Sequence, residues 1–167
     1  MPYWQIFYHF VWATRNREAL ITPDVESMIY ELIHDKATDL KTTVHALNGM
    51  AEHVHLVASV PPGLAPATFV GQIKGFTSTM FNKASVRELP FSWQAEYGVF
   101  TFDQKRLHNV ADYVINQKTH HANGNVIPLL ERVEEYPGRT IHEAPASYMI
   151  DDTEWWREML ELDIGVG

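Results

Sequence analysis

Two hydrophobic periodicities alternate along the first 120 residues of the chain. Four segments are rich in aromatic and β-branched residues, which favours strands: 3–13, 42–47, 52–60 and 91–102. Three segments carry apolar residues three and four positions apart, which predicts amphipathic helices: one from Pro23, one over 65–84 and one over 103–120. The order β-α-β-β-α-β-α is typical of an α+β fold. It predicts a mostly antiparallel sheet with helices packed on it, close to a ferredoxin-like split β-α-β arrangement.

Short turn signals connect these segments. Asn48-Gly49 favours a tight turn, so it predicts an antiparallel hairpin between the second and third strands. Thr22 precedes Pro23 and is expected to cap the first helix. The last strand is expected to be either continuous or an irregular pair around Tyr97-Gly98. The predicted elements end near residue 120, and the character of the chain changes after Gly124.

Charge separates the chain into two parts. The formal net charge is −8, from 13 Lys and Arg against 21 Asp and Glu. Residues 126–167 hold three of the basic and ten of the acidic residues, which leaves ten and eleven in the nearly neutral stretch 1–125. We predict a domain over 1–124 and an acidic C-terminal extension over 125–167 that wraps it and takes no part in chemistry. The neutral domain still allows local basic positions to meet phosphate.

Composition excludes several kinds of chemistry. The chain has no cysteine, so it has no disulfides, thiolate metal sites or thiol nucleophiles. Its apolar first residues lack a basic leader and are interrupted by Gln5 and His9, so no signal peptide is expected. No uninterrupted apolar run approaches the roughly 18 residues of a membrane span. We therefore expect a cytoplasmic protein.

Two histidines lie two positions apart in the third predicted strand. Side chains of a strand alternate between its faces, so His53 and His55 point the same way. Neutral imidazole is a common ligand of divalent metals, and a site completed by a third ligand leaves room for substrate. A His-x-His sequence also arises by chance in core or surface strands. The pair therefore indicates a metal site only together with a second group.

A tyrosine and a glutamine one helical turn apart supply that second group. Tyr113 and Gln117 project together from the third predicted helix, away from its apolar stripe. Beside a His-bound metal, the phenol can act as nucleophile in phosphodiester chemistry and Gln117 as an oxygen ligand. His120 or His121 is an alternative third ligand if the helix lies slightly deeper. Taken singly, Tyr113 and Gln117 are typical of an amphipathic helix surface.

Five stretches occur in an order that is more specific than His-x-His alone. They are Tyr8-His9-Phe10-Val11-Trp12, His53-Val54-His55, Lys74-Gly75, Tyr97-Gly98-Val99-Phe100 and Tyr113-Val114-Ile115-Asn116-Gln117. Spread over roughly residues 4–121, they resemble the single-tyrosine HUH transposases of the insertion sequence 200/605 family. That family includes the tyrosine transposases associated with repetitive extragenic palindromes. The resemblance implies a metal-dependent endonuclease and strand transferase that acts on single-stranded DNA at hairpin-flanked sites.

The resemblance also implies roles for individual residues. Tyr113 would be the catalytic nucleophile that forms a 5′-phosphotyrosine and releases a 3′-hydroxyl. His53, His55 and Gln117 would bind Mg²⁺ or Mn²⁺. Family members work as homodimers in which the tyrosine helix of one subunit can complete the His site of the other. On its DNA, the protein would be nucleoid-associated.

DNA contacts would fall on basic side chains of the domain. The first candidates are Arg15, Arg17 and Lys74, and the secondary candidates are Lys83, Lys105 and Arg106. Solvated surface charge is the simpler interpretation of each one. The acidic extension departs from the family pattern, which leaves open whether the protein is mobile or domesticated.

Three alternatives remain open from the sequence. A rolling-circle or relaxase-type nickase commonly has a lysine three positions after its tyrosine, where this chain has Asn116, or adds a third histidine to the pair. A non-catalytic or domesticated DNA-hairpin-binding protein would keep the fold without turnover. A metal hydrolase unrelated to DNA is the third alternative. The chain lacks the His-Glu-x-x-His signature that is expected of such an enzyme.

Overall fold

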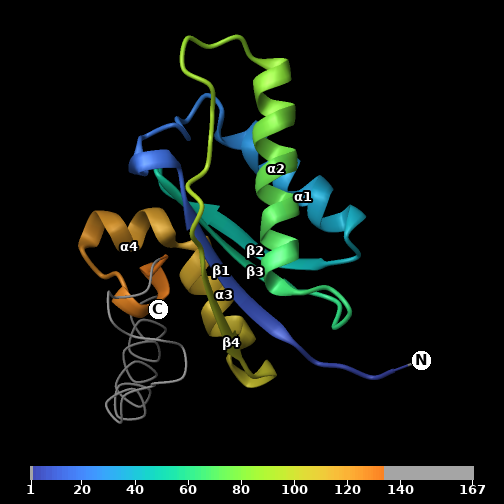
Figure 1. Ribbon diagram of the computed structural model, residues 1–167. Helices are drawn as coiled ribbons and strands as arrows, with labels where there is room; N and C mark the ends of the chain where they lie inside the picture. The colour runs from blue at the N-terminus through green and yellow to red at the C-terminus, as the bar shows by residue number, and fades with distance from the viewer. Residues whose placement is uncertain (1, 134–167) are drawn as a thin grey trace, which may run out of the picture.

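Four strands form one antiparallel sheet in the computed structural model, which describes residues 2–133 (Figure 1). In chain order they are β1 (Phe7–Ala13), β2 (Thr43–Gly49), β3 (His53–Ser59) and β4 (Gly98–Phe102). Their spatial order is β2-β3-β1-β4, so the strands joined through a helix are not neighbours. β1 lies between β3 and β4 and pairs antiparallel with both. The α+β fold with a ferredoxin-like split β-α-β arrangement is confirmed.

Helices cover both faces of this sheet. α1 (Glu26–Asp39) and α2 (Pro66–Ala84) pack together on one face. α3 (Leu107–Ile115) and α4 (Gln117–Asn123) lie on the other, as Figure 1 shows. Three short 3₁₀ helices complete the described chain: η1 (Arg15–Arg17), η2 (Gln104–Arg106) and η3 (Pro128–Glu131). Within residues 2–133, no helix combines the length and the apolar character needed to cross a bilayer.

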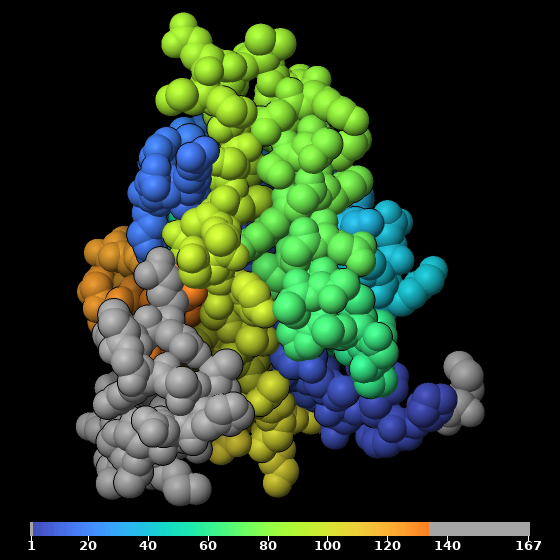
Figure 2. Space-filling view, viewed as in Figure 1, coloured from blue at the N-terminus to red at the C-terminus, as the bar shows by residue number. Residues whose placement is uncertain are grey.

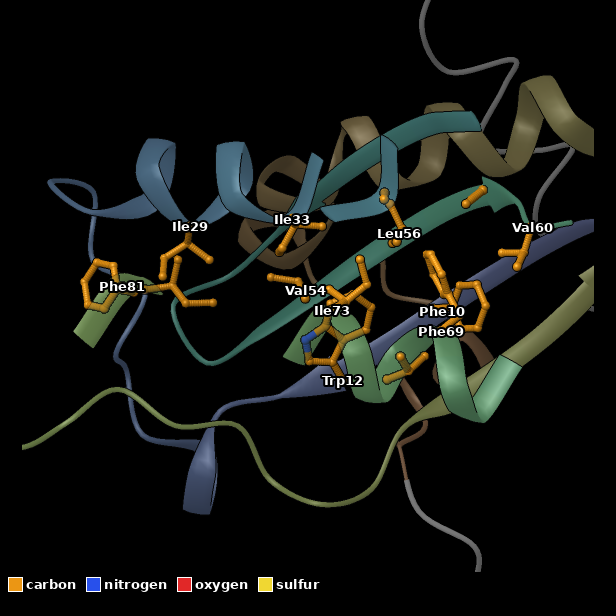
Figure 3. Close-up of a cluster of buried hydrophobic side chains, with 14 of the residues drawn as sticks. Phe10, Trp12, Ile29, Ile33, Val54, Leu56, Val60, Phe69, Ile73 and Phe81 are labelled. Atoms are coloured by element: carbon orange, nitrogen blue, oxygen red, sulfur yellow. The ribbon is translucent and has the colours of Figure 1, made fainter. Parts of the chain in front are cut away.

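The main core lies between the sheet and the α1–α2 layer (Figure 3). Strand alternation sends the even-numbered residues of β1 and β3 to this face, among them Phe10, Trp12, Val54 and Leu56. The helices contribute apolar residues at helical spacing: Ile29 and Ile33 from α1, and Phe69, Ile73 and Phe81 from α2. Each such side chain stabilises the fold by about 1.5–3 kcal/mol when fully buried.

The opposite face of the sheet carries a smaller core and the polar groups. Ala46 and Val57 pack here against α3 and η3, through Val110, Val114 and Leu130. The same alternation sends odd-numbered residues of β1 and β3 to this face, including His9, His53 and His55. The imidazoles therefore face the helix that carries Tyr113.

The predicted turn at Asn48-Gly49 is wrong. β2 continues through Gly49, and residues 50–52 make the connection to β3. Asn48 Nδ2 instead donates to the carbonyl of Ile115 at 2.6 Å, which ties the end of β2 to the end of α3. A Cβ on Gly49 would overlap the backbone of His53, so glycine at this position allows β2 and β3 to approach each other closely.

The predicted helix over 103–120 is divided. Asn116 lies between α3 and α4 with φ −94° and ψ 17°, and its side-chain amide donates to the carbonyl of Asp112 at 2.9 Å. Such a local bond competes with helical continuation. The division changes the direction of the chain between Tyr113 and Gln117.

Two other predicted boundaries shift. Only Gly98–Phe102 of the segment 91–102 is a strand. At the start of the segment the Asn82 side-chain amide forms hydrogen bonds with both the N–H and the carbonyl of Phe91, each at 2.8 Å, so these groups do not pair with a strand. The first helix begins at Glu26 and not at Pro23, and its N-cap position is Val25. The backbone N–H groups of Val25 and Glu26 both donate to the carbonyl of Thr22 at 3.0 Å, so residues 22–26 form a turn that leads into the helix.

The start of the predicted extension packs on the domain. Ile127, Leu130 and Val133 are buried, and the carbonyl of Arg132 lies where a Cβ on Gly98 would be. Residues 134–167, most of the predicted acidic extension, lie outside the described residues. The domain boundary at 124/125 stays a prediction.

Candidate active site

The His pair lies at the beginning of β3, under the segment that contains η3. His53 is 2% exposed and His55 is fully buried. Their Nε2 atoms lie 3.0 and 3.2 Å, respectively, from one carboxylate oxygen, Oε2 of Glu131. The predicted common face of the two histidines therefore leads to a single acidic side chain from a distant part of the sequence.

The Nδ1 atom of each ring has its own partner. His53 Nδ1 donates to Glu52 Oε1 at 2.8 Å, since a carboxylate can only accept. His55 Nδ1 lies 2.8 Å from His9 Nε2, within the buried layer. Such outer partners hold the rings of metal-binding histidines in orientation. Both Nε2 atoms are consequently aimed at Glu131.

Tyr113 reaches the same carboxylate from α3. Its hydroxyl donates to Glu131 Oε1 at 2.7 Å and accepts from the backbone N–H of Ile127 at 3.0 Å. Burial raises the pKa of the Tyr113 phenol, and the nearby Glu131 carboxylate raises it further. The phenol is therefore protonated at neutral pH and needs a proton acceptor before it can attack. Tyr113 and the His pair therefore meet at Glu131.

Glu131 joins the two halves of the site. Burial alone would raise its pKa, but hydrogen bonds from His53, His55 and Tyr113 outweigh burial and hold the pKa well below its usual range. Glu131 is thus a carboxylate at neutral pH, with one oxygen toward the histidines and the other toward the tyrosine. The sequence alone places Glu131 in the predicted acidic extension and indicates no role for it.

α4 brings the remaining predicted candidates to the site. Gln117 is fully buried, and neither atom of its amide has a hydrogen-bond partner within residues 2–133. His121 Nε2 lies 3.4 Å from Glu131 Oε2, and its ring centroid lies 5.1 Å from that of His53. The His120 ring stacks on Tyr113 at 4.9 Å. His121 is therefore nearer to the His pair than His120 is.

Lys118 and Asn48 fix α4 against the sheet. Lys118 Nζ donates to Asn48 Oδ1 at 2.8 Å and lies 3.0 Å from Glu26 Oε2. Both contacts are within one chain, and the Asn48–Ile115 bond adds a third tie. These ties hold Tyr113 and Gln117 beside the histidines of the same chain.

The donor set fits a divalent metal. One ligand atom from each of His53, His55 and Glu131 lies within 4.8 Å of the others. Adjacent ligands about 2.1 Å from an octahedral ion are separated by roughly 3.0 Å, close to the carboxylate distances above. The Nε2 atoms of His53 and His55 both face Glu131 Oε2. A shared metal ion would bind these converging atoms, and the Gln117 amide, which has no hydrogen-bond partner within residues 2–133, can add a ligand.

Acid is expected to destabilise the metal-free protein through Glu131. The pKa of Glu131 in the folded protein lies below the ordinary value of 4.5. As the pH falls, Glu131 is therefore protonated in the unfolded chain before it is protonated in the folded one. The free energy of unfolding therefore decreases as the pH falls below about 4.5, and this decrease is smaller in Glu131→Gln. Urea unfolding between pH 3 and 7 in chelator measures it. Glu88→Gln, an exposed carboxylate, is the control, and identical pH profiles for Glu131→Gln and wild type would contradict the expectation.

The predicted DNA-contact residues fall into two groups. Arg15 and Arg17 are exposed in η1, and neither guanidinium forms an ion pair within the described residues. η1 follows the end of β1 that pairs with His53, so these charges lie near the site. Lys83 ends α2 near the same end of the sheet. Lys105 and Arg106 lie beyond the Phe102 end of β4, at the other end, where Arg106 pairs with Asp103 at 2.9 Å.

Lys74 has a different role from the predicted phosphate contact. Its Nζ donates to the carbonyls of Gln94, Ala95 and Glu96 at 3.0, 3.1 and 2.7 Å. Burial lowers the pKa of Lys74 to about 8, so the ammonium still predominates at pH 7 and supplies all three N–H groups. Figure 2 shows the loop of residues 85–97 between α2 and the N-terminal turn that contains η1. Lys74 holds this loop and has no N–H left for a phosphate.

Lys74→Met is expected to loosen the loop that the ammonium holds. Loss of three donated bonds should lower the free energy of unfolding by about 1–3 kcal/mol. Urea unfolding and hydrogen exchange of residues 94–97 measure the two effects. Lys83→Met, on the exposed end of the same helix, is the control. Unchanged exchange in Lys74→Met would show that the ammonium does not hold the loop.

Sequence reasoning missed Glu131, Glu52 and His9 as members of this site. Glu131 lies in η3, a different element from the Tyr113 helix and from the histidine strand, so no local periodicity relates it to either one. Glu52 directly precedes His53, so the motif carried a signal for it. His9 offered a weaker signal, as a single imidazole in an otherwise apolar strand.

Comparisons with known proteins indicate the family and match the fold. A family model described as Transposase IS200 like matches residues 2–117. The ISDra2 transposase TnpA of Deinococcus radiodurans is 24% identical over 119 residues, which are 68% of this chain and 85% of that protein. A solved structure of a transposase candidate from D. radiodurans R1 has a TM-score of 0.56 at 24% identity and covers 70% of this chain and 93% of its own.

A second solved structure extends the comparison. It is a REP-associated tyrosine transposase bound to a REP hairpin, with a TM-score of 0.54 and 20% identity. The match covers 86% of this chain and 81% of that one. At these identities the two solved structures support the fold, whereas the family model spans more than half of this chain. The chain therefore belongs to the IS200-like transposase family.

Proposed function

We propose that this protein is a metal-dependent endonuclease and strand transferase for single-stranded DNA, with Tyr113 as nucleophile. One observation carries the proposal: the Tyr113 hydroxyl and the Nε2 atoms of His53 and His55 converge on one carboxylate, Glu131. A nucleophile, a carboxylate that accepts its hydrogen bond and candidate metal ligands thus share one site. Membership of the transposase family supplies DNA as the substrate class.

His53, His55 and Glu131 would hold the metal, and Gln117 is the proposed additional ligand. Mg²⁺ or Mn²⁺ suits this set, because both favour oxygen ligands and phosphate. When bound, the ion would neutralise charge on the phosphate oxygens and favour in-line displacement. Glu52 and His9 would orient the two imidazoles from behind.

The proposed reaction exchanges one phosphoester for another. The Tyr113 hydroxyl, positioned by its hydrogen bond to Glu131 Oε1, loses its proton to solvent as the phenol oxygen forms a bond to a DNA phosphorus. The bond from that phosphorus to the 3′-oxygen breaks, and this oxygen takes up a proton from solvent. The products are a 5′-phosphotyrosine and a 3′-hydroxyl. Because the new linkage conserves a phosphoester, a later 3′-hydroxyl can reverse the step without ATP.

Hairpin-containing DNA is the proposed partner. The support is fold similarity to a protein solved with a REP hairpin. Arg15 and Arg17 are the proposed phosphate contacts, because they are exposed beside the end of the sheet that carries His53. For Lys74 we propose an indirect effect on DNA through the loop that it holds. Action in the cytoplasm, on the nucleoid, is part of this proposal.

A homodimer is also proposed, on family resemblance. β4 forms one edge of the sheet, and Val99 in it is 37% exposed, so this edge is a candidate for contact with a second copy. Dimerisation is not needed to bring Tyr113 to the His pair, because both belong to one chain. Sedimentation of the protein with and without hairpin DNA measures the oligomeric state.

Covalent trapping tests the proposed function. The full chain is incubated with a pool of labelled single-stranded hairpin DNAs in Mn²⁺, Mg²⁺ or chelator, and the products are separated on a denaturing gel. We expect a protein–DNA adduct that requires the metal. Hairpin binding with no adduct in either metal would favour a non-catalytic or domesticated hairpin-binding protein instead. Absence of both would return the site to the metal-hydrolase alternative.

A further inference from the structure

A third imidazole lies directly behind the His pair. His9 is fully buried in β1, and its Nε2 lies 2.8 Å from Nδ1 of His55. The two rings are nearly parallel, with 12° between their planes and 5.0 Å between their centroids. On the strand ladder His9 pairs with Val57 and His55 with Val11, so the two histidines are diagonal neighbours on one face. Their contact is therefore fixed by the register of β1 and β3.

His9 and His55 share one proton between their facing nitrogens. His9 Nε2 and His55 Nδ1 lie 2.8 Å apart between two fully buried rings, so one nitrogen must donate and the other must accept. A neutral imidazole has one N–H and one lone pair, so the direction of this bond and the tautomers of the two rings are linked. If one ring carries this proton, the facing nitrogen of the other ring must accept it, which fixes the tautomer of that ring.

The two possible directions of this bond correspond to two states of the site. Without metal, His55 Nε2–H donates to Glu131 Oε2 at 3.2 Å, which leaves His55 Nδ1 to accept from His9 Nε2–H. With metal, His55 Nε2 would offer its lone pair and release its proton to solvent, and the proton between the rings would belong to His55 Nδ1, which donates it to His9 Nε2. His9 would then take up a proton from solvent on Nδ1. That atom has no partner within residues 2–133, so no neighbour there fixes the His9 tautomer.

We propose that His9 is a positioning residue that accepts the Nδ1 proton of His55 when His55 binds metal, so that metal binding reverses the direction of the His9–His55 hydrogen bond. The inference rests on the metal site of the proposed function. It distinguishes the two histidines of the pair. His53 is oriented by Glu52, a carboxylate that only accepts, whereas His55 is oriented by a group that can donate or accept.

Tautomers in the full wild-type chain test the reversal directly. Long-range ¹H–¹⁵N spectra of ¹⁵N-histidine-labelled protein distinguish Nδ1–H from Nε2–H rings, and Mg²⁺ is a diamagnetic probe. We expect both His9 and His55 to change from Nε2–H to Nδ1–H on saturation with Mg²⁺. A His9 ring with the same tautomer in both states would overturn the proposal. This measurement needs no variant to fold.

Mn²⁺ affinity, measured by calorimetry, provides the second test. His9→Leu removes the acceptor and should weaken Mn²⁺ binding by about 10- to 100-fold. His9→Gln, which can accept near the position of Nε2, should recover most of that loss. His45→Leu is the matched control, because His45 is a partly buried histidine that bonds Ser59 on β3, away from the His pair.

The outcomes separate this inference from the proposed function. If His9→Leu folds and binds Mn²⁺ as tightly as wild type, the role of His9 is wrong and the metal site stands. If wild type binds neither Mn²⁺ nor Mg²⁺, the metal site and the role of His9 both fail. Loss of affinity in His9→Leu together with recovery in His9→Gln supports the proposal, since lost packing alone would not be rescued by an amide.

Discussion

Tyr113→Phe is expected to form no covalent adduct with hairpin DNA while it still folds and binds that DNA. The substitution removes the one atom proposed to attack phosphorus and keeps the ring that packs in the smaller core. Removal of a nucleophile eliminates the covalent step itself, so adduct should fall below detection and not by a small factor. Denaturing gels measure the adduct, and gel shifts measure binding.

The matched control is Tyr30→Phe. Tyr30 is a half-buried tyrosine of α1, and its hydroxyl has no hydrogen-bond partner among the described residues. This variant should form adduct like wild type. Tyr113→Phe also loses bonds to Glu131 and Ile127, so its unfolding midpoint must be compared with that of wild type. An adduct that persists in Tyr113→Phe would assign the nucleophile to another side chain.

Glu131→Ala is expected to weaken Mn²⁺ binding by at least about 100-fold and to reduce adduct formation with it. Loss of an outer partner of a metal ligand typically costs 10- to 100-fold in affinity, and loss of a direct carboxylate ligand should cost more. The variant also removes the oxygen that positions the Tyr113 hydroxyl. Calorimetry with Mn²⁺ and the gel assay at saturating Mn²⁺ separate these two effects.

The same variant distinguishes a ligand from an obstruction. If the Glu131 carboxylate only fills the space between the His pair and Tyr113, its removal would free Tyr113 and increase adduct formation without loss of metal affinity. Glu18→Ala, an exposed glutamate after η1, controls for a general change in charge. More adduct in Glu131→Ala than in wild type would remove Glu131 from the proposed mechanism.

Local periodicity was sufficient to predict the arrangement of elements. Apolar residues at helical spacing predicted α2 over 65–84, and the helix is Pro66–Ala84. Aromatic and β-branched stretches located all four strands, although only the second half of 91–102 is one. These features depend on repeats of two or 3.6 residues, which the backbone geometry of each element imposes. The predicted element order was therefore correct, while the boundaries that depend on single side chains, such as Asn82 and Asn116, were not.

The sequence by itself determined that His53 and His55 share a face, because that relation follows from local backbone geometry. Tyr113 and Gln117 were predicted on one helix, but Asn116 divides it, so their relation depends on the junction of α3 and α4. Only the tertiary structure decided which groups meet them. Glu131 arrives through η3, and His9 faces His55 only because β1 pairs with β3 in one register. Lys74 bonds loop carbonyls that are 20 to 22 residues away. Contacts of this kind depend on strand register and packing across the whole fold, and no short repeat in the chain encodes them.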